Sequence, residues 1–358
     1  MKKNLAVIIF LVLSLLLVTR VLISSPLTLS SFAKYVAPLN IKQLNGPTPT
    51  PSPISGNDIE RLGLQKNFQD EITAAGLEDN ISIYYNNLAY NYVVSINADR
   101  SWIPASVVKV FVLPEAFRQK EERIINFDSR VVIDQDNVVP TELESQDYQP
   151  LRAGSRATIR ELVYAMITQS DNTAYNTLLD ILDRRNVTAT LRKLGLANTV
   201  VGEKLSLDDT QYAIDLMVPG RQPNRTTAQD FANLFTILYN KKIADADEMI
   251  TILKQQKLND MLPAMLPPHT QIAHKTGAWS PYYHDGGIVY KPNEPYIIAV
   301  FTDADNPNVV ARLSKIAYYK SRDVLGVSTT NWTNSVLELF YRIERFFLIP
   351  QVLFRGNP

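Results

Sequence analysis

The sequence predicts a mixed α/β (α+β) domain in which two helical blocks flank one sheet. Strand-like runs rich in β-branched and aromatic residues occur near both ends of the domain, at 81–96, with a turn expected at 86–87, and at 286–302. Apolar residues have helical spacing before the first run, at 58–76, and after the last, at 306–319. We therefore expect a sheet whose strands come from both ends of the domain.

The chain begins with a pattern typical of export. Lys2 and Lys3 precede an apolar run, 5–18, and Arg20 interrupts a further short apolar piece. A snorkelling arginine can extend such a run toward the roughly 20 residues that span a bilayer. No small-residue cleavage site follows, so we expect a signal-anchor over residues 1–24. The rest would then lie outside the cytoplasm on the cell membrane, or be secreted if the signal is cleaved.

Three further parts are expected after this anchor. Residues 25–57 are a juxtamembrane stretch and a stalk, because proline alternates with threonine or serine at 47–53. Such a segment is extended and semi-rigid and builds no core. Residues 58–325 form the folded domain. Residues 326–358 are an amphipathic extension that packs on the domain or, alternatively, lies on the membrane or a partner.

The middle of the domain is expected to be largely helical. The Thr-x-x-Glu pattern at 158–161 is a capping box, and it opens a helix that ends near Gln169. Two more helices are expected at 173–182 and 226–238. The stretch between them, 198–225, carries few helix signals, and irregular segments of this length are often functional.

Composition excludes several classes of function. Lys+Arg and Asp+Glu both number 36, so no general attraction to nucleic acid is expected. The chain has no cysteine, which excludes disulfides and thiolate metal sites. His269, His274 and His284 lack the spacing of metal ligands. We therefore expect no metal and no cofactor. We also expect a monomer.

Ser106 and Lys109 form a Ser-x-x-Lys pattern at the start of an expected buried helix, 104–117. Residues i and i+3 share a helix face, so the lysine amine can reach the serine hydroxyl. A desolvated amine that loses its proton can act as the base that activates a serine. By itself the pattern also fits a core helix with a snorkelling lysine.

Two further motifs follow in the order Ser-Asp-Asn, at 170–172, and Lys-Thr-Gly, at 275–277. Together with Ser-x-x-Lys they are the set found in class A β-lactamases and penicillin-binding proteins. Their surroundings fit as well, with Thr-Ile-Arg-Glu-Leu at 158–162 and Gly-Gly-Ile-Val at 286–289. Over roughly residues 60–320, the chain resembles the serine β-lactamase and penicillin-binding protein superfamily, closest to class A β-lactamases.

The resemblance implies the class A fold, an αβα sandwich with an antiparallel sheet beside an all-helical subdomain. It also implies acyl transfer, in which one side-chain donor to the oxyanion contributes about 3–4 kcal/mol. By this resemblance Ser106 is the acylated nucleophile, Lys109 is its base, and Ser170 relays a proton to the leaving nitrogen. Asn172 would contact the substrate amide, and Lys275 and Thr276 would contact the substrate carboxylate. The N–H groups of Ser106 and Ala278 would form the oxyanion hole.

The base that would hydrolyse the acyl-enzyme is harder to assign. Class A β-lactamases carry it in a Glu-x-x-Leu-Asn pattern, which the stretch 198–225 lacks. Counting back from Pro219 places Gln211 at the glutamate's position, whereas counting forward from Gly195 brings Glu203 near it. We take Glu203 as the candidate base. Other carboxylates of this stretch remain alternatives, namely Asp208, Asp209 and Asp215.

Three possible functions follow from this resemblance. The favoured one is a β-lactamase that opens small-molecule β-lactams through an acyl-enzyme and so confers antibiotic resistance. The second is a penicillin-binding, D,D-peptidase-like enzyme that acts on D-alanyl peptides of the cell wall. The third is a catalytically weak wall-binding or scaffold protein that retains the pocket.

Overall fold

The computed structural model describes residues 56–140, 148–206 and 223–319. The expected anchor, almost all of the expected stalk and the C-terminal extension lie outside these residues, as does most of the irregular stretch after residue 206. Within the described ranges, no helix is long and apolar enough to cross a membrane. All of the described residues belong to one compact unit.

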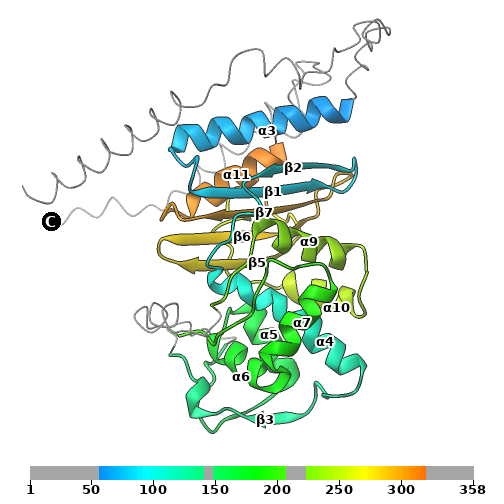
Figure 1. The fold of residues 1–358 in the computed structure, drawn as a ribbon, viewed down its shortest axis with the longest axis vertical. Coiled ribbons are helices and arrows are strands. Elements are labelled where there is room, and N and C mark those ends of the chain that lie inside the picture. The colour runs from blue at the N-terminus through cyan, green and yellow to red at the C-terminus, as the bar shows by residue number, and fades with distance from the viewer. Residues whose placement is uncertain (1–55, 141–147, 207–222, 320–358) are drawn as a thin grey trace, which may run out of the picture. The chain divides into compact units, whose positions relative to one another are not determined.

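A five-stranded antiparallel sheet in the order β2-β1-β7-β6-β5 forms the centre of this unit (Figure 1). Its first two strands pair with its last three through β1 and β7, where Ile83 lies opposite Val300. The sheet therefore joins strands from both ends of the domain, as the sequence predicted. The strands are β1 Ile81–Asn87, β2 Tyr92–Ile96, β5 Ile272–Trp279, β6 Tyr282–Val289 and β7 Tyr296–Thr302.

The turn expected at 86–87 is wrong by a few residues. Asn86 and Asn87 belong to β1 and lie opposite Val93 and Tyr92 of β2. The side-chain oxygen of Asn87 accepts hydrogen bonds from the N–H groups of the next turn, including that of Tyr90 at 2.9 Å. The asparagine thus shapes the turn from its first flank, because its side chain imitates a backbone turn.

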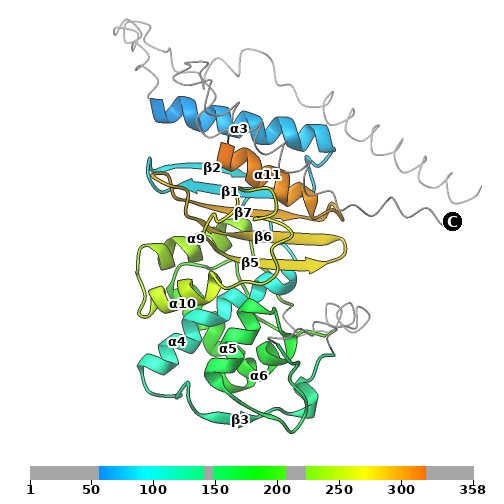
Figure 2. The ribbon, with the colours of Figure 1, turned by 180° about the vertical axis from the view of Figure 1, so that it is seen from behind.

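The central strand β7 is buried on both faces. Tyr296, Ile298 and Val300 belong to a core shared with helices α3 (Gly56–Ala75) and α11 (Asn308–Tyr319). The alternate residues, including Phe301, belong to a second core on the opposite face. Side chains of a strand alternate between faces, so one strand can serve both cores. Figures 1 and 2 show α3 and α11 on one side of the sheet and the remaining helices on the other.

A largely helical part fills that second side. Its helix α5 begins at the predicted capping box, in which Thr158 and Glu161 each bond the other's backbone N–H. Two helices that the sequence analysis did not predict are α7, which is rich in polar residues, and α10, which spans only eight residues. The elements are η2 Ala105–Val112, α4 Leu113–Glu121, β3 Arg130–Val132, η3 Gln135–Asn137, β4 Arg156–Thr158, α5 Ile159–Thr168, α6 Asn172–Leu182, α7 Arg184–Lys193, α9 Ala228–Tyr239 and α10 Ala246–Leu253.

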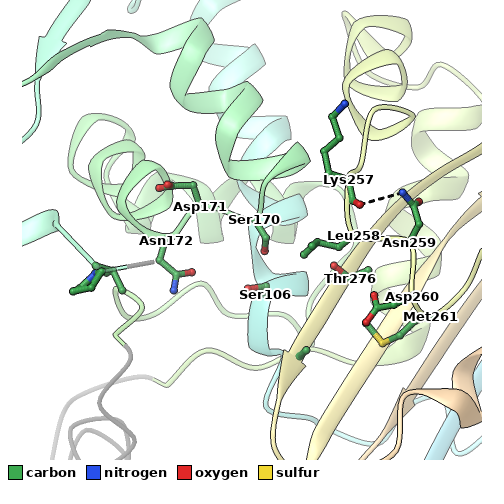
Figure 3. Close-up of a pocket in the computed structure, with 13 residues that line it drawn as sticks. Ser106, Ser170, Asp171, Asn172, Lys257, Leu258, Asn259, Asp260, Met261 and Thr276 are labelled. Atoms are coloured by element: carbon green, nitrogen blue, oxygen red, sulfur yellow. Dashed lines mark hydrogen bonds between the residues drawn. The ribbon is translucent and has the colours of Figure 1, made fainter. Parts of the chain in front are cut away.

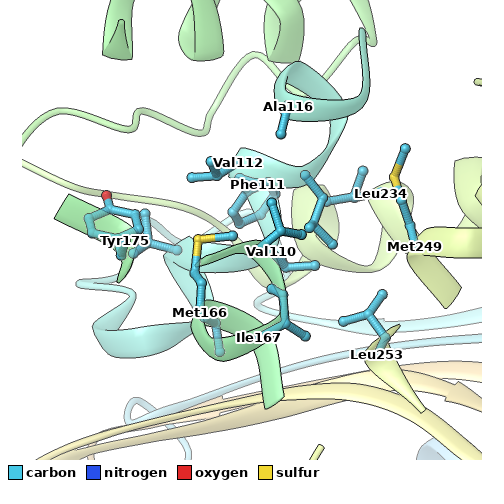
Figure 4. Packing of buried hydrophobic residues seen from close by; sticks show 14 of the residues in the cluster. Val110, Phe111, Val112, Ala116, Met166, Ile167, Tyr175, Leu234, Met249 and Leu253 are labelled. Carbon is cyan, nitrogen blue, oxygen red and sulfur yellow. The ribbon is translucent and has the colours of Figure 1, made fainter. Parts of the chain in front are cut away.

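The segment η2 lies at the centre of the helical part and touches the sheet through β5. Every residue of η2 except Ser106 is buried, which is the pattern of a helix that is surrounded on all sides. Figure 4 shows its apolar side chains among those of neighbouring helices, such as Met166 of α5 and Leu234 of α9. This packing fixes the position of Ser106 between sheet and helices.

Candidate active site

Ser106 lies in the first turn of η2, and no other residue of that helix lines the cavity described below. Lys109 lies on the same face and is fully buried, with its Nζ 2.8 Å from the Ser106 Oγ. Ala105, directly before the serine, has a left-handed φ of +46°. Strained backbone of this kind persists where the surrounding structure over-determines it, and it often lies at functional sites.

The amine of Lys109 is held by two segments besides its own helix. It donates to the main-chain oxygen of Ser170 over 2.6 Å and to Oδ1 of Asn172 over 2.6 Å, and it contacts the Ser170 Oγ at 3.2 Å. Burial holds the pKa of Lys109 well below its usual range, and the charge of Lys275 lowers it further, although Asp171 opposes both. A lysine whose pKa is depressed by burial can accept a proton near neutral pH.

The Ser-Asp-Asn motif occupies the junction between α5 and α6. Ser170 has a left-handed φ of +58°, which turns its side chain toward the two lysines. Asp171 is the N-cap of α6, because its carboxylate accepts from the N–H of Ala174 over 2.6 Å. The hydroxyl of Tyr148 donates to the other carboxylate oxygen. The aspartate thus fixes the helix start that presents its two neighbours to the cavity.

Lys275 reaches the same junction from strand β5. Its buried amine donates to the Ser170 Oγ over 2.9 Å and to the main-chain oxygen of Thr276 over 2.8 Å. Burial lowers the pKa of Lys275 to about 7, and the carboxylate of Asp285 opposes this shift. The cation is therefore poised to respond to an anion placed beside it.

Gly277 lets β5 approach η2 closely. A Cβ at this position would lie 2.8 Å from the Pro104 carbonyl oxygen and 2.9 Å from the Val107 nitrogen, distances that side-chain atoms do not tolerate. The glycine of Lys-Thr-Gly is thus required by the contact between strand and helix. The same contact brings Ala278, the next residue of β5, to the cavity that Ser106 also lines.

The cavity has a volume of about 850 Å³ and is shown in Figure 3. Six of the residues named in the sequence analysis line it, and the amines of Lys109 and Lys275 reach it only through the hydroxyls of Ser106 and Ser170. The structure therefore brings distant parts of the sequence together. The motifs did not predict two parts of the lining, residues 257–261 on the opposite side and the pair Val139 and Pro140. The lining residues are Ser106, Val139, Pro140, Ser170, Asp171, Asn172, Lys257, Leu258, Asn259, Asp260, Met261, Thr276 and Ala278.

The chain matches a known protein family. The model of the Beta-lactamase enzyme family matches residues 63–320, which is well over half of the chain. The chain belongs to this family. It is accordingly a serine hydrolase of the β-lactamase type.

Individual β-lactamases and related structures are similar over most of this domain. A β-lactamase of Bacteroides uniformis is 26% identical over 60% of this chain and 77% of its own length. The β-lactamase FAR-1 of Nocardia farcinica is 27% identical over 65% of this chain and 70% of its own. The structure of PBP-A superposes with a TM-score of 0.61 at 25% identity, over 71% of this chain and 94% of PBP-A. A class A β-lactamase of Bacteroides cellulosilyticus shares the fold, with a TM-score of 0.60 at 21% identity over 74% of this chain and 99% of its own.

Glu203 does not lie with the other residues predicted for this β-lactamase-family site. Its carboxylate forms an ion pair with Arg184 at 2.9 Å, and the residue lines a separate cavity of about 570 Å³ beside α7. Within the described residues, the candidate base and Ser106 thus line different cavities. The alternative positions, Asp208, Asp209, Gln211 and Asp215, lie outside them.

Metal ligands are not grouped in the described part of this family member. Among those residues, no three or more His, Asp or Glu side chains come together in a way that could hold an ion. Two histidines of the sheet, His274 and His284, instead have hydrogen-bond partners within the protein.

Proposed function

We propose that this protein opens β-lactams by forming an acyl-enzyme on Ser106. The observation that carries this proposal is the contact of 2.8 Å between the Ser106 Oγ and the amine of a fully buried lysine. A neutral Lys109 at this distance can take the hydroxyl proton as the oxygen attacks a carbonyl carbon. The names of the β-lactamase relatives and the penicillin G acyl-enzyme of a PBP-A variant support the choice of substrate.

The residues around the cavity can supply and accept the protons that acylation moves. The Ser106 Oγ bonds to the lactam carbonyl carbon, its proton passes to Lys109, and the ring C–N bond breaks. The leaving nitrogen receives a proton through Ser170, whose Oγ lies 3.2 Å from Lys109 and 2.9 Å from Lys275. The N–H groups of Ser106 and Ala278 would stabilise the oxyanion, as both residues line the cavity.

The carboxylate that penicillins carry would bind at Lys275 and Thr276. Thr276 lines the cavity, and the lysine amine lies behind it on the same strand. An incoming anion favours the charged form of a lysine whose pKa burial has brought to about 7. Binding of the carboxylate would therefore be accompanied by proton uptake at mildly alkaline pH.

A second candidate is a penicillin-binding, D,D-peptidase-like enzyme. It is favoured by the separation of Glu203 from the Ser106 cavity and by the similarity to PBP-A. Without a base to activate water, the acyl group would stay on the serine. Export and attachment to the membrane remain part of either proposal, on the strength of the first 24 residues of the sequence.

The test is intact mass of the full chain after addition of a penicillin, followed over time. An adduct that forms and disappears while penicilloate accumulates would support the β-lactamase. A persistent adduct would support the penicillin-binding enzyme. Ser106→Ala is the matched control and should form no adduct, whereas an equal adduct in this variant would place acylation on another residue. No adduct on the parent chain would overturn both proposals for penicillins and favour a scaffold.

A further inference from the structure

A buried histidine and aspartate join the two strands next to the cavity. The Nδ1 of His274 in β5 is 2.9 Å from Oδ1 of Asp285 in β6. The same carboxylate accepts the main-chain N–H of Leu262 over 2.9 Å and that of Gly286 over 2.8 Å. Hydrogen bonds of this kind stabilise the anionic carboxylate. An ionised carboxylate can only accept, so Nδ1 of the histidine must be the donor.

The other ring nitrogen also faces an acceptor. His274 Nε2 lies 3.2 Å from Oδ1 of Asn259. The orientation of this amide is fixed, because its Nδ2 donates to the carbonyl oxygens of Gln256 and Lys257, each over 3.2 Å; Figure 3 shows the second bond. Rotating the amide would turn its oxygen toward two carbonyl oxygens. An amide oxygen accepts only, and Nε2 must therefore carry a proton as well.

We infer that His274 is an imidazolium cation that acts as a positioning residue, fastening the cavity wall 256–262 to the sheet through Asn259 and Asp285. The side chains of His274 and Asp285 are 2% and 0% exposed, so neither charge has water as a counterpart. Each charge thus requires the other in place. The segment 256–262 then has two anchors on the sheet, the Asn259 side chain and the Leu262 N–H.

The second buried histidine of this sheet has the opposite pattern. His284 donates from Nε2 to the Ile103 carbonyl over 2.9 Å and accepts at Nδ1 from the Thr302 N–H over 3.2 Å. One ring nitrogen donates and the other accepts, which describes a neutral ring. Burial also lowers the pKa of His284 to about 4. His284 is therefore a neutral histidine in the same molecule, with which the charge of His274 can be compared.

The charge of His274 matters for the cavity because of where the wall lies. Asn259, Asp260 and Met261 line the cavity next to Thr276, and Asp285 is the carboxylate that supports the charge of Lys275. Loosening the wall would alter the end of the cavity where we place the substrate carboxylate. This effect on substrate rests on the proposed function, whereas the charge of His274 does not.

The charge is tested by ¹⁵N–¹H correlation spectra of the imidazole rings in the uniformly labelled full-length chain. The chain has only three histidines, so His269→Gln and His284→Gln assign the signals. At neutral pH we expect both nitrogens of His274 to resonate together at the protonated position, and those of His284 to be widely split. A split pair for His274, which a proton residing on Asp285 would also produce, would overturn the inference.

The positioning role is tested by removing the acceptor. Asn259→Ala should abolish the imidazolium signature and raise KM for a penicillin, or the half-saturating concentration for acylation, roughly tenfold with a smaller change in the maximal rate. The control is Asn240→Ala, at an exposed asparagine outside the cavity.

Two outcomes separate this inference from the proposed function. An unchanged KM in Asn259→Ala, with the ring proton lost, would overturn the positioning role. Absence of acylation in the parent chain would count against the proposed function, and the ring spectra would still decide the charge of His274.

Discussion

Lys109 and Lys275 direct their amine nitrogens at one oxygen, the Ser170 Oγ, over 3.2 and 2.9 Å. Both side chains are fully buried, and the charge of Lys275 lowers the pKa of Lys109. Two buried like charges so close together favour a state in which only one amine is protonated. Ser170 therefore connects an amine suited to accept a proton with one suited to remain a cation, and a hydroxyl can relay a proton between such partners.

Ser170→Ala removes this shared oxygen. We expect the rate of acylation by a penicillin to fall by about 10²–10⁴-fold, because the leaving nitrogen loses its proton donor. Rapid-quench intact mass measures that rate, and thermal unfolding checks that the fold persists. A rate within a few-fold of the parent would contradict the relay.

The charge of Lys275 predicts a pH dependence. Its pKa is about 7 in the unliganded enzyme, so the cationic fraction falls about tenfold per pH unit above that value. The second-order acylation constant for a carboxylate-bearing β-lactam should fall with it as pH rises. Lys275→Arg keeps its charge and should move this alkaline limb to higher pH. A β-lactam without the carboxylate is the control, and an identical limb for both substrates would contradict the assignment.

Glu203→Gln tests the base that the sequence suggested. Its ion pair with Arg184, which is half exposed, contributes less than about 1 kcal/mol to stability. We expect the lifetime of the acyl-enzyme, measured by intact mass, to be unchanged, because the carboxylate lines a different cavity from Ser106. Glu122→Gln, which breaks another surface pair with an arginine, is the matched control. An adduct that persists only in the Glu203 variant would restore the glutamate as base.

Gly277→Ala should damage both stability and acylation. The new Cβ would meet the backbone of the segment that holds Ser106 at 2.8–2.9 Å, and overpacking of this kind costs about 1–3 kcal/mol. Urea unfolding measures the loss, and intact mass measures acylation. Gly56→Ala, where no atom lies within 4 Å of the added carbon, is the control. Equal effects of the two substitutions would exclude a steric role for Gly277.

His284 predicts acid sensitivity of the fold. Its pKa is about 4 in the folded protein against 6.5 for the ordinary group, so the unfolded chain binds the proton first as pH falls. The free energy of unfolding should therefore decrease between these values, by about 3 kcal/mol at most from this group. His284→Gln should remove that part of the slope in urea unfolding, and His269→Gln, at an exposed site, should retain it. The same slope in both variants would contradict the prediction.

Local patterns were predictable because their causes lie within a few residues. Thr158 and Glu161 satisfy each other's backbone donors one helical turn apart, and Ser106 and Lys109 meet for the same geometric reason. The predicted position of the turn after β1 was wrong by a few residues, because an asparagine can shape a turn from its flank as well as from its centre. The short helix α10 offers only two turns of periodicity, which is too little to distinguish it from a loop.

The sequence by itself determined the family, the nucleophile candidate and the helices and strands that carry the three motifs. Only the tertiary structure decided that Lys275 reaches Ser170 across 105 positions, that Glu203 faces a second cavity, and that Asn259 meets His274. The physical reason is that hydrogen-bond spacing and periodicity act along the chain, whereas burial and the partners of a charge depend on segments that meet only after folding. The pKa of Lys275 and the charge of His274 are properties of that enclosure, and the residue types alone do not set them.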